Sequence, residues 1–224
     1  MPPLSEDHDR INRELVETVG PILERSAQLG FLGGMPVTEQ IEHALGFCEA
    51  AECHLGGGAP PSALDLGTGG GIPGLVLAAV WPEVELTLFD ANQRRTDFLS
   101  EEVEAWGVSG RVKVLRGRAE EIGRISGLRG AFSLITARSF GSPAVTAECA
   151  APLLEVGGIL VVSEPPDANP SERWPSEGLA VVGLAPGSIY RHLERFGYQV
   201  LEKRSETPDK FPRRTGIPTK RPLF

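Results

Sequence analysis

The sequence predicts an α/β fold in which a mostly parallel sheet is covered by helices on both faces. From residue 62 onward, short aliphatic and β-branched runs alternate with segments of helical periodicity, which is the pattern of a doubly wound sheet with right-handed crossovers. The first run, over residues 62–67, leads into the glycine-rich stretch 67–74. Such a turn allows positive φ and presents unpaired N–H groups at the start of a helix. It is therefore typical of a ligand-binding loop.

The N-terminal quarter of the chain predicts helices instead of strands. Apolar residues recur at helical spacing over about 5–30, and a second helix is expected over 38–53 with Thr38 as its N-cap. A Gly- and Pro-rich linker occupies 54–61. We therefore expect a helical cap with its linker over residues 1–58 and a second domain over residues 59–224.

The second domain carries the alternating pattern. The expected strands cover residues 62–67, 84–90, 111–115, 131–137 and 159–163. The expected helices cover 73–81, with Pro73 at the first position, 94–106, and 142–154, with Ser142 as N-cap. The proline-rich, polar stretch 164–175 predicts an exposed loop. Beyond it we expect a strand over 179–184, a helix over 187–196 and a strand over 198–203.

Composition excludes several classes of protein. The sequence has no run of about 18 apolar residues, so we expect no membrane span. Its start lacks the basic and apolar regions of a secretory signal. The three cysteines are odd in number and, like the four scattered histidines, lack metal-ligand spacing. We therefore expect a cytoplasmic protein with reduced thiols and no metal site.

Charge is unevenly distributed along the chain. The net charge is −8, yet residues 203–224 carry seven basic and two acidic side chains. A local basic patch attracts phosphates even on an acidic protein. A solvated charged terminus remains the alternative for this basic tail.

The identity of the expected cofactor depends on Asp65. The spacing Gly69-x-Gly71-x-x-Gly74 fits a dinucleotide fingerprint. Asp65, however, stands two residues before the loop, and a carboxylate at a helix N-terminus repels a pyrophosphate. S-adenosylmethionine carries a cationic sulfonium, an α-ammonium group and no phosphate, so the carboxylate favours this cofactor.

Acidic residues also follow the next two strands. Asp90 ends the second strand, where a carboxylate accepts hydrogen bonds from ribose hydroxyls, and Ala119 and Glu120 follow the third, within reach of an adenine edge. Carboxyl ends of neighbouring parallel strands form one ligand crevice. The alternatives are that Asp65 caps its turn, that Asp90 caps the next helix and that Glu120 is solvated. The joint pattern predicts a Rossmann-like class I S-adenosylmethionine-dependent methyltransferase fold with an N-terminal helical cap.

Several motifs resemble one family, the RsmG methyltransferases, also called glucose-inhibited division protein B, which methylate N7 of a guanine in 16S (small-subunit) ribosomal RNA. The motifs are the loop 65–74, Asp90 with the pair Arg94-Arg95, the segments 117–121 and 136–140, and the ending 211–223. The resemblance implies that Gly67, Ile72, Ala119, Glu120 and Arg138 contact the cofactor or line its pocket. The glycine loop and the acids at the strand ends add further residues to this set. The expected cofactor-binding residues are Asp65, Gly67, Gly69, Ile72, Asp90, Ala119, Glu120 and Arg138.

The resemblance also implies a substrate and its contacts. Guanine N7 carries a lone pair and no proton, so the reaction needs no general base. Arg138 is the expected catalytic residue because it would orient the guanine, the alternative being a salt bridge to a neighbouring acid. The RNA contacts are expected from Arg213, Arg214, Lys220 and Arg221. The expected partner is small-subunit ribosomal RNA or the subunit, bound by a monomer.

Two departures from the family pattern leave alternatives open. Of the N-terminal motif only His43 is kept, and a histidine in this setting is slightly more often a packed helix residue than a functional one. After the fifth strand Ser163-Glu164 stands where the family commonly has Lys-Gly, which weakens phosphate attraction. A small-molecule methyltransferase and a non-catalytic RNA-binding module with a vestigial pocket are therefore the alternative functions.

Overall fold

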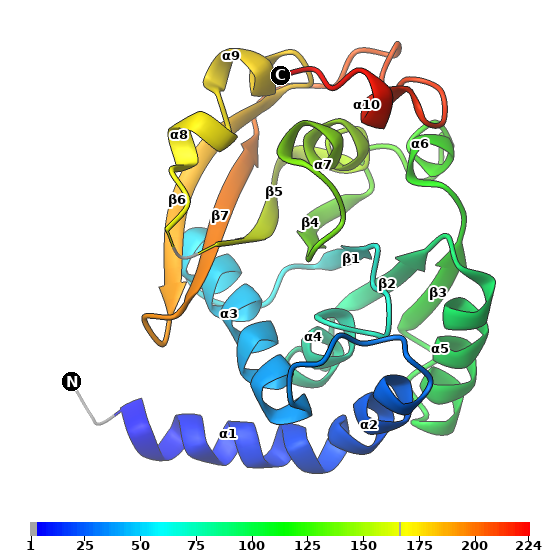
Figure 1. Cartoon of the computed structure of the whole chain (residues 1–224), viewed down its shortest axis with the longest axis vertical. Coiled ribbons are helices and arrows are strands. Elements are labelled where there is room, and N and C mark those ends of the chain that lie inside the picture. Colours follow the sequence, from blue (N-terminus) through cyan, green and yellow to red (C-terminus); the bar gives the residue numbers. More distant parts are fainter. Residues whose placement is uncertain (1–3, 166) are drawn as a thin grey trace.

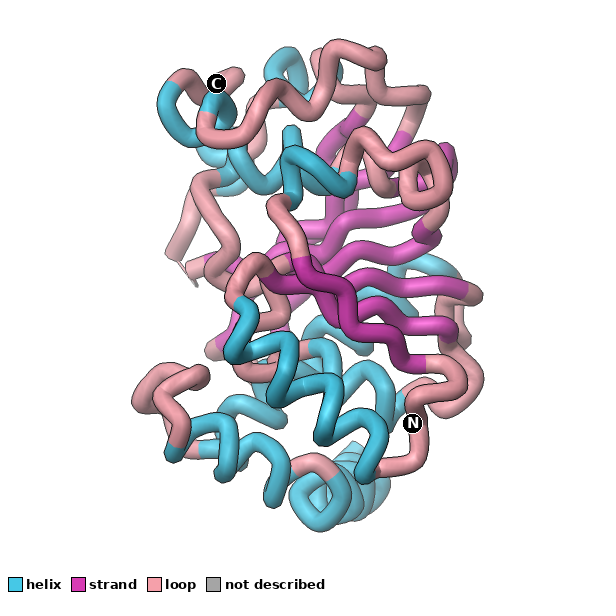
Figure 2. Tube along the Cα trace, turned by 90° about the vertical axis from the view of Figure 1, so that its right-hand side faces the viewer, coloured by secondary structure: helices cyan, strands magenta, loops and turns pink. Residues whose placement is uncertain are grey.

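A computed structural model describes residues 4–165 and 167–224, and its centre is a sheet of seven strands in the order β3-β2-β1-β4-β5-β7-β6. Figures 1 and 2 show helices on both faces of this sheet. The strands are β1 (Ser62–Leu66), β2 (Glu85–Asp90), β3 (Val112–Arg116), β4 (Phe132–Ala137), β5 (Leu154–Glu164), β6 (Leu184–His192) and β7 (Phe196–Lys203). The first five pair in parallel, and β7 is antiparallel to both β5 and β6. The carboxyl ends of β1 to β5 therefore lie at one edge.

Ten helices are found among the described residues. They are α1 (Leu4–Thr18), α2 (Gly20–Gln28), α3 (Val37–Leu55), α4 (Gly74–Val80), α5 (Gln93–Ala105), α6 (Ala119–Ile122), α7 (Pro143–Ala150), α8 (Pro170–Arg173), α9 (Ser176–Ala180) and α10 (Ile217–Lys220). None of these helices combines the length and the apolar character that a membrane span requires.

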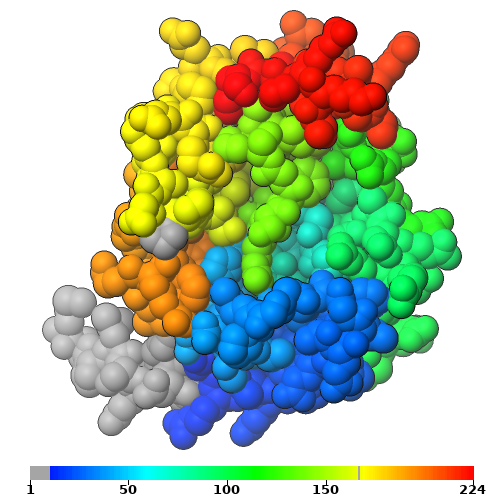
Figure 3. Space-filling view, in the orientation of Figure 1, coloured from blue at the N-terminus to red at the C-terminus, as the bar shows by residue number. Residues whose placement is uncertain are grey.

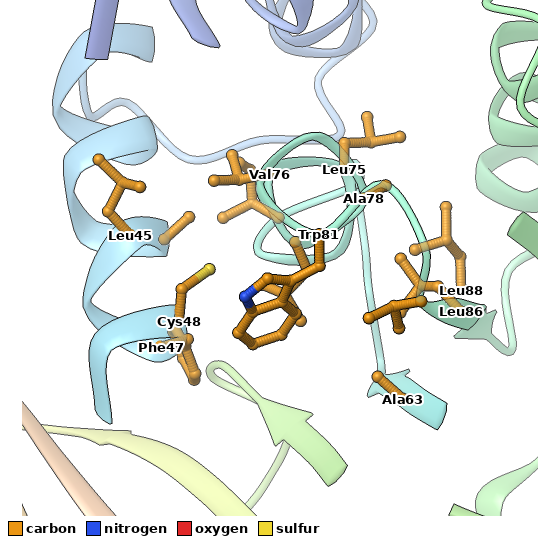
Figure 4. Close-up of a cluster of buried hydrophobic side chains, with 14 of the residues drawn as sticks. Leu45, Phe47, Cys48, Ala63, Leu75, Val76, Ala78, Trp81, Leu86 and Leu88 are labelled. Atoms are coloured by element: carbon orange, nitrogen blue, oxygen red, sulfur yellow. The ribbon is translucent and has the colours of Figure 1, made fainter. Parts of the chain in front are cut away.

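The N-terminal helices share a core with the sheet. Figure 4 shows Phe47 and Cys48 of α3 beside Val76 of α4 and Trp81, with Leu88 of β2 on the other side. All five side chains are at most 3% exposed. Removing such apolar surface from water is the main force that holds α3 and α4 against the sheet. The cap therefore packs directly on the sheet, and a domain boundary at residue 58 stays a prediction.

The alternating strands and helices between residues 62 and 163 are confirmed, with shifts at the helix ends. The third helix begins at Val37 after Pro36, so Thr38 is not its N-cap. Pro73 occupies the N-cap position of α4, one residue earlier than expected. Ser142 is the N-cap residue of α7, although its side chain makes no capping hydrogen bond. Each shift moves a boundary without changing the element.

The prediction for the last third was wrong in two places. Residues 187–196 belong mainly to strand β6 instead of a helix, because they pair with β7 in a hairpin in which Tyr190 faces Tyr198. Residues 179–184 contribute to helix α9 and its end instead of a strand. Pairing with a neighbouring strand commonly overrides local propensity.

The stretch 164–175 is also not simply an exposed loop. It contains the four-residue helix α8, and the Trp174 side chain that follows is only 2% exposed. Trp174 packs with Leu179 in the apolar cluster on the α7 side of the sheet. One aromatic residue thus anchors this proline-rich segment to the core.

Candidate cofactor and substrate site

A cavity of about 260 Å³ lies at the carboxyl ends of β1, β2 and β3. Four residues singled out from the sequence line it, namely Gly67, Asp90, Ala119 and Glu120. Residues outside the expected cofactor-binding set also line it, and they include Phe89, Arg95, Ser139, Phe140, Cys149 and Thr219. Of these six, Phe89 and Cys149 also lie outside the motifs singled out from the sequence. The structure therefore brings the glycine loop and two of the three acids together, as expected for the crevice of a parallel sheet.

Asp90 holds the glycine loop in place while facing this cavity. Its Oδ2 accepts the backbone N–H of Gly69 at 2.9 Å, and its Oδ1 accepts that of Asn92 at 2.8 Å. Asn92, and not Asp90, is the N-cap of α5. The Asp90 side chain is 9% exposed, and its carboxylate retains acceptor capacity toward the cavity because each oxygen has two lone pairs.

Glu120 joins the cavity to the C-terminal tail. Its Oε1 accepts the backbone N–H of Gly216 at 2.9 Å, and the residue is 6% exposed, so it is not a solvated loop residue. Thr219 of α10 contributes to the cavity lining. The tail therefore forms part of the cavity wall next to Glu120, the residue that we expect to contact the adenine edge of the cofactor.

Asp65 lies behind the glycine loop and does not line the cavity. Its Oδ2 accepts the N–H of Gly74 at 2.8 Å, and its Oδ1 accepts the hydroxyl of Thr136 at 3.0 Å. The first of these bonds caps α4, which is the alternative that the sequence left open. Burial raises the pKa of Asp65 to about 6, against the lowering effect of hydrogen bonds from Thr68, Gly74 and Thr136.

The raised pKa of Asp65 predicts a pH-dependent contribution to stability. The folded protein holds this proton more tightly than the unfolded chain, so the contribution is present below about pH 4 and is lost as pH rises to about 6. We expect the free energy of unfolding of the wild type, relative to Asp65→Asn, to fall by up to about 3 kcal/mol across this window. Urea denaturation at several pH values measures this difference. A difference that stays constant from pH 4 to 7 contradicts the prediction.

The other predicted loop residues have separate positions. Gly67 has φ +75°, and a Cβ there would lie 2.6 Å from the Phe140 ring, so glycine is required. Gly69 donates to Asp90 without lining the cavity, and Ile72 is 4% exposed in the core beneath the loop. Direct cofactor contact by Gly69 and Ile72 stays a prediction.

Arg138 faces the N-terminal helices, and it lines neither this cavity nor the second one described below. Its Nη1 donates to Oε1 of the buried Gln40 on α3 at 3.1 Å, so its partner is an amide and not the acid considered above. Burial lowers the pKa of Arg138. His43, one turn further along α3, packs against Phe196 and is a packed helix residue. The catalytic role of Arg138 stays a prediction.

Only three of the four predicted RNA-binding residues are exposed cations. Arg214, Lys220 and Arg221 are exposed. The guanidinium of Arg213 instead holds Glu148, whose side chain is fully buried, with an Nη2–Oε2 distance of 2.6 Å. Arg213 therefore fixes the tail to α7, whereas its neighbour Arg214 is directed to solvent. Figure 3 shows the tail in red along one end of the face that also bears the yellow-green segment after β4.

A second cavity of about 190 Å³ adjoins the first and shares Ser139 and Phe140 with it. It also contains Glu164 at the end of β5, the position where the sequence departs from the family pattern. The Glu164 carboxylate is paired with Arg173 and accepts the indole N–H of Trp174 at 3.1 Å. Arg173 thus balances the negative charge of Glu164. The repulsion between this carboxylate and the phosphates of a substrate is therefore smaller than the sequence suggested.

The residues of the first cavity fit S-adenosylmethionine. Asp90 and Glu120 supply acceptors for ribose and adenine donors. The guanidinium of Arg95 is 3.6 Å from Asp90, and that of Arg118 is 3.9 Å from Glu120. Both cations lining the cavity therefore already have carboxylate partners, which is unfavourable for a pyrophosphate and suits a cofactor that carries none.

Comparison with known proteins identifies the family. The family model for rRNA small subunit methyltransferase G matches residues 40–164, more than half of the chain. The "Ribosomal RNA small subunit methyltransferase G" of Deinococcus radiodurans is 38% identical over 72% of this chain, and the match spans 65% of that protein's length. The protein of the same name from Moorella thermoacetica is 33% identical, over 73% of this chain and 71% of its own.

Solved structures resemble the fold at low sequence identity. A putative O-methyltransferase from Klebsiella pneumoniae has a TM-score of 0.59 at 15% identity and covers 88% of this chain and 97% of its own. Cofactor-bound Rv0187 from MTB has a TM-score of 0.60 at 16% identity and covers 92% and 100%. These likenesses confirm the methyltransferase fold. By its sequence, the chain belongs to the rRNA small subunit methyltransferase G family, and it is a methyltransferase whose methyl donor is S-adenosylmethionine.

Proposed function

We propose that this chain transfers the methyl group of S-adenosylmethionine to N7 of a guanine in 16S ribosomal RNA. The observation that carries the proposal is the pair of adjoining cavities at the carboxyl ends of the strands, which share Ser139 and Phe140. One cavity offers acceptors for an adenosine, and the other has room beside it for a base. Family membership supports the substrate, and it does not favour the two alternative functions.

The proposed chemistry is an in-line displacement at the methyl carbon. The cofactor supplies an activated methyl group, and guanine N7 supplies the lone pair that forms the new bond. The carbon–sulfur bond breaks with its electron pair on sulfur, which leaves S-adenosylhomocysteine and a cationic 7-methylguanine. The chain contributes by holding donor and acceptor in line at near-attack distance, and we place that meeting point at Ser139 and Phe140. Asp90 and Glu120 hold the cofactor.

The proposal is tested by methyl transfer to RNA. The full chain is incubated with S-adenosylmethionine labelled in its methyl group and with either naked 16S RNA or assembled small subunits. We expect label in one of these RNAs, located on guanine N7 by mass spectrometry of the digested nucleosides. Absence of label in both, with S-adenosylmethionine bound, contradicts the RNA substrate.

Three exposed cations of the tail are proposed to contact RNA phosphates. We expect Arg214→Ala, Lys220→Ala and Arg221→Ala each to weaken RNA binding and to reduce the salt dependence by about one phosphate contact. The measurement is filter binding of 16S RNA at several salt concentrations. Lys113→Ala, an exposed lysine on the edge strand β3, is the matched control. Equal effects of the tail variants and the control contradict the assignment.

We further propose that a single chain acts in the cytoplasm, where ribosomal subunits are found. Light scattering of the protein bound to a small subunit tests the monomer.

A further inference from the structure

The second cavity contains a buried carboxylate that the proposed mechanism does not use. Glu164 ends β5, next to the end of β4 that leads into Ser139. Its side chain is 8% exposed, although a charge buried to this extent is unfavourable unless hydrogen-bond donors compensate it. An apolar side chain at this position in the cavity would be buried at a lower cost in free energy than the carboxylate.

The donors that compensate Glu164 form a specific pattern. Its Oε1 accepts the indole N–H of Trp174 at 3.1 Å and Nη2 of Arg173 at 3.4 Å, and its Oε2 accepts Nε of Arg173. The buried Trp174 fixes one oxygen. Arg173 donates two N–H groups side by side, which is the fork geometry that matches a carboxylate.

Guanine presents the same pair of donors on its Watson–Crick edge. Its N1–H and its exocyclic 2-amino group point in parallel, so one carboxylate accepts both. Adenine has an acceptor at N1, cytosine has an acceptor at N3, and uracil has a single N–H between two carbonyls. Enzymes that modify a base read this edge after moving the base out of its stack. Guanine is therefore the RNA base that matches Glu164.

Resting on the proposed function, we propose that Glu164 is the specificity-determining residue of the methyl transfer, accepting N1–H and the 2-amino group of the target guanine in the second cavity. In the free protein, Arg173 occupies these acceptors. Its side chain is 38% exposed and lies at the end of the four-residue helix α8. A guanine that displaces the guanidinium supplies two N–H donors for the two it replaces, so the buried carboxylate stays hydrogen-bonded.

This orientation also directs the reacting atom correctly. N7 lies on the side of the purine away from the 2-amino group. With the Watson–Crick edge on Glu164, N7 points back toward Ser139 and Phe140, the two residues that both cavities share. Recognition at one end of the base and methyl transfer at the other are therefore compatible within one pocket.

The test compares guanosine with inosine, which lacks only the 2-amino group. Two 16S RNAs are prepared by ligation, with guanosine or inosine at the position that the wild type methylates, and kcat/KM is measured for each. We expect the wild type to prefer guanosine at least about 10-fold, the effect of one hydrogen bond to a charged acceptor. In Glu164→Gln this ratio is expected to fall toward one. Glu172→Gln, which removes a nearby exposed charge, keeps the wild-type ratio.

The ratio separates recognition from a structural role, because a loss of folding lowers transfer to both RNAs equally. Equal transfer to both RNAs by the wild type, or an unchanged ratio in Glu164→Gln, overturns this inference and leaves the proposed function intact. A wild type that methylates neither RNA overturns both. If Glu164→Gln does not fold, Glu164→Asp is used in its place, because it withdraws the carboxylate by one methylene. Its ratio of kcat/KM for guanosine RNA to kcat/KM for inosine RNA is also expected to fall.

Discussion

Arg213→Ala is expected to lower the free energy of unfolding by about 3 kcal/mol, because it leaves a buried carboxylate without its partner. Glu148 is 0% exposed. Its Oε1 accepts the Arg213 backbone N–H at 2.8 Å and Nε at 2.9 Å, and its Oε2 accepts Nη2 at 2.6 Å. Alanine preserves only the backbone contact, and burial without a partner is unfavourable for the remaining charge.

The same substitution is expected to weaken cofactor binding about tenfold, through loss of part of the cavity wall. Nη2 of Arg213 also donates to the carbonyl of Arg221 at 2.7 Å, which holds the turn containing Thr219 against the cavity. Urea denaturation and calorimetric titration with S-adenosylmethionine measure the two effects.

Neighbouring variants separate this role from RNA binding. Arg214→Ala removes the same charge from the next, exposed residue and is expected to leave stability and cofactor affinity unchanged. Adding Glu148→Gln to Arg213→Ala removes the buried charge and is expected to recover part of the lost stability. If the free energy of unfolding of Arg213→Ala stays within about 0.5 kcal/mol of the wild-type value, the ion pair has no structural role.

Asp90→Ala is expected to raise the dissociation constant of S-adenosylmethionine about 100-fold. The proposed hydrogen bonds from the ribose hydroxyls to this charged acceptor are worth about 3 kcal/mol together, and this free energy corresponds to that factor. Alanine also releases the N–H of Gly69, so the glycine loop loses its contact with the end of β2. Calorimetric titration with S-adenosylmethionine measures the change.

Two further variants control for charge and for the loop. Asp97→Ala removes the same charge from an exposed position of α5 and is expected to bind the cofactor as the wild type does. Asp90→Asn retains an acceptor oxygen, and its dissociation constant is expected to lie between those of the wild type and Asp90→Ala. Equal affinities of Asp90→Ala and Asp97→Ala would exclude Asp90 from the cofactor site.

Local signals predicted the part of the site that is built from consecutive residues. The run into Gly67, the acid at the end of β2 and the acid that follows β3 are visible in the sequence, because strand ends and glycine turns have local signatures. The parallel topology then brought Asp90 and Glu120 to one cavity. The same logic misplaced Asp65, because the sequence does not show which side of the loop its carboxylate occupies.

Long-range contacts explain what the sequence did not show. Arg213 and Arg214 have the same local signal, and only the contact with Glu148 distinguishes them. Lys203 counted toward the basic tail, yet it is 3% exposed and donates to the carbonyl of Ala151 at 2.6 Å. Burial lowers its pKa to about 8. Charge along the sequence therefore overstated the cations available to RNA.

Strand β6 was missed for a related reason. The residues of β6 do not alternate regularly between the two faces, because Ser188 and Ile189 are both exposed and the strand has a bulge between Pro186 and Ile189. Its hydrogen bonds to β7 are formed only in the folded hairpin. Propensity taken from one segment alone does not include a partner strand.

In the proposed complex, S-adenosylmethionine binds between Asp90 and Glu120 with its methyl group toward the second cavity. A crystal structure of the chain with S-adenosylhomocysteine tests this placement. We expect ribose hydroxyls on the Asp90 carboxylate, adenine beside Ala119 and Glu120, and sulfur facing Ser139 and Phe140. Density for the ligand in any other cavity, or with its sulfur turned away from these two residues, would rule this placement out.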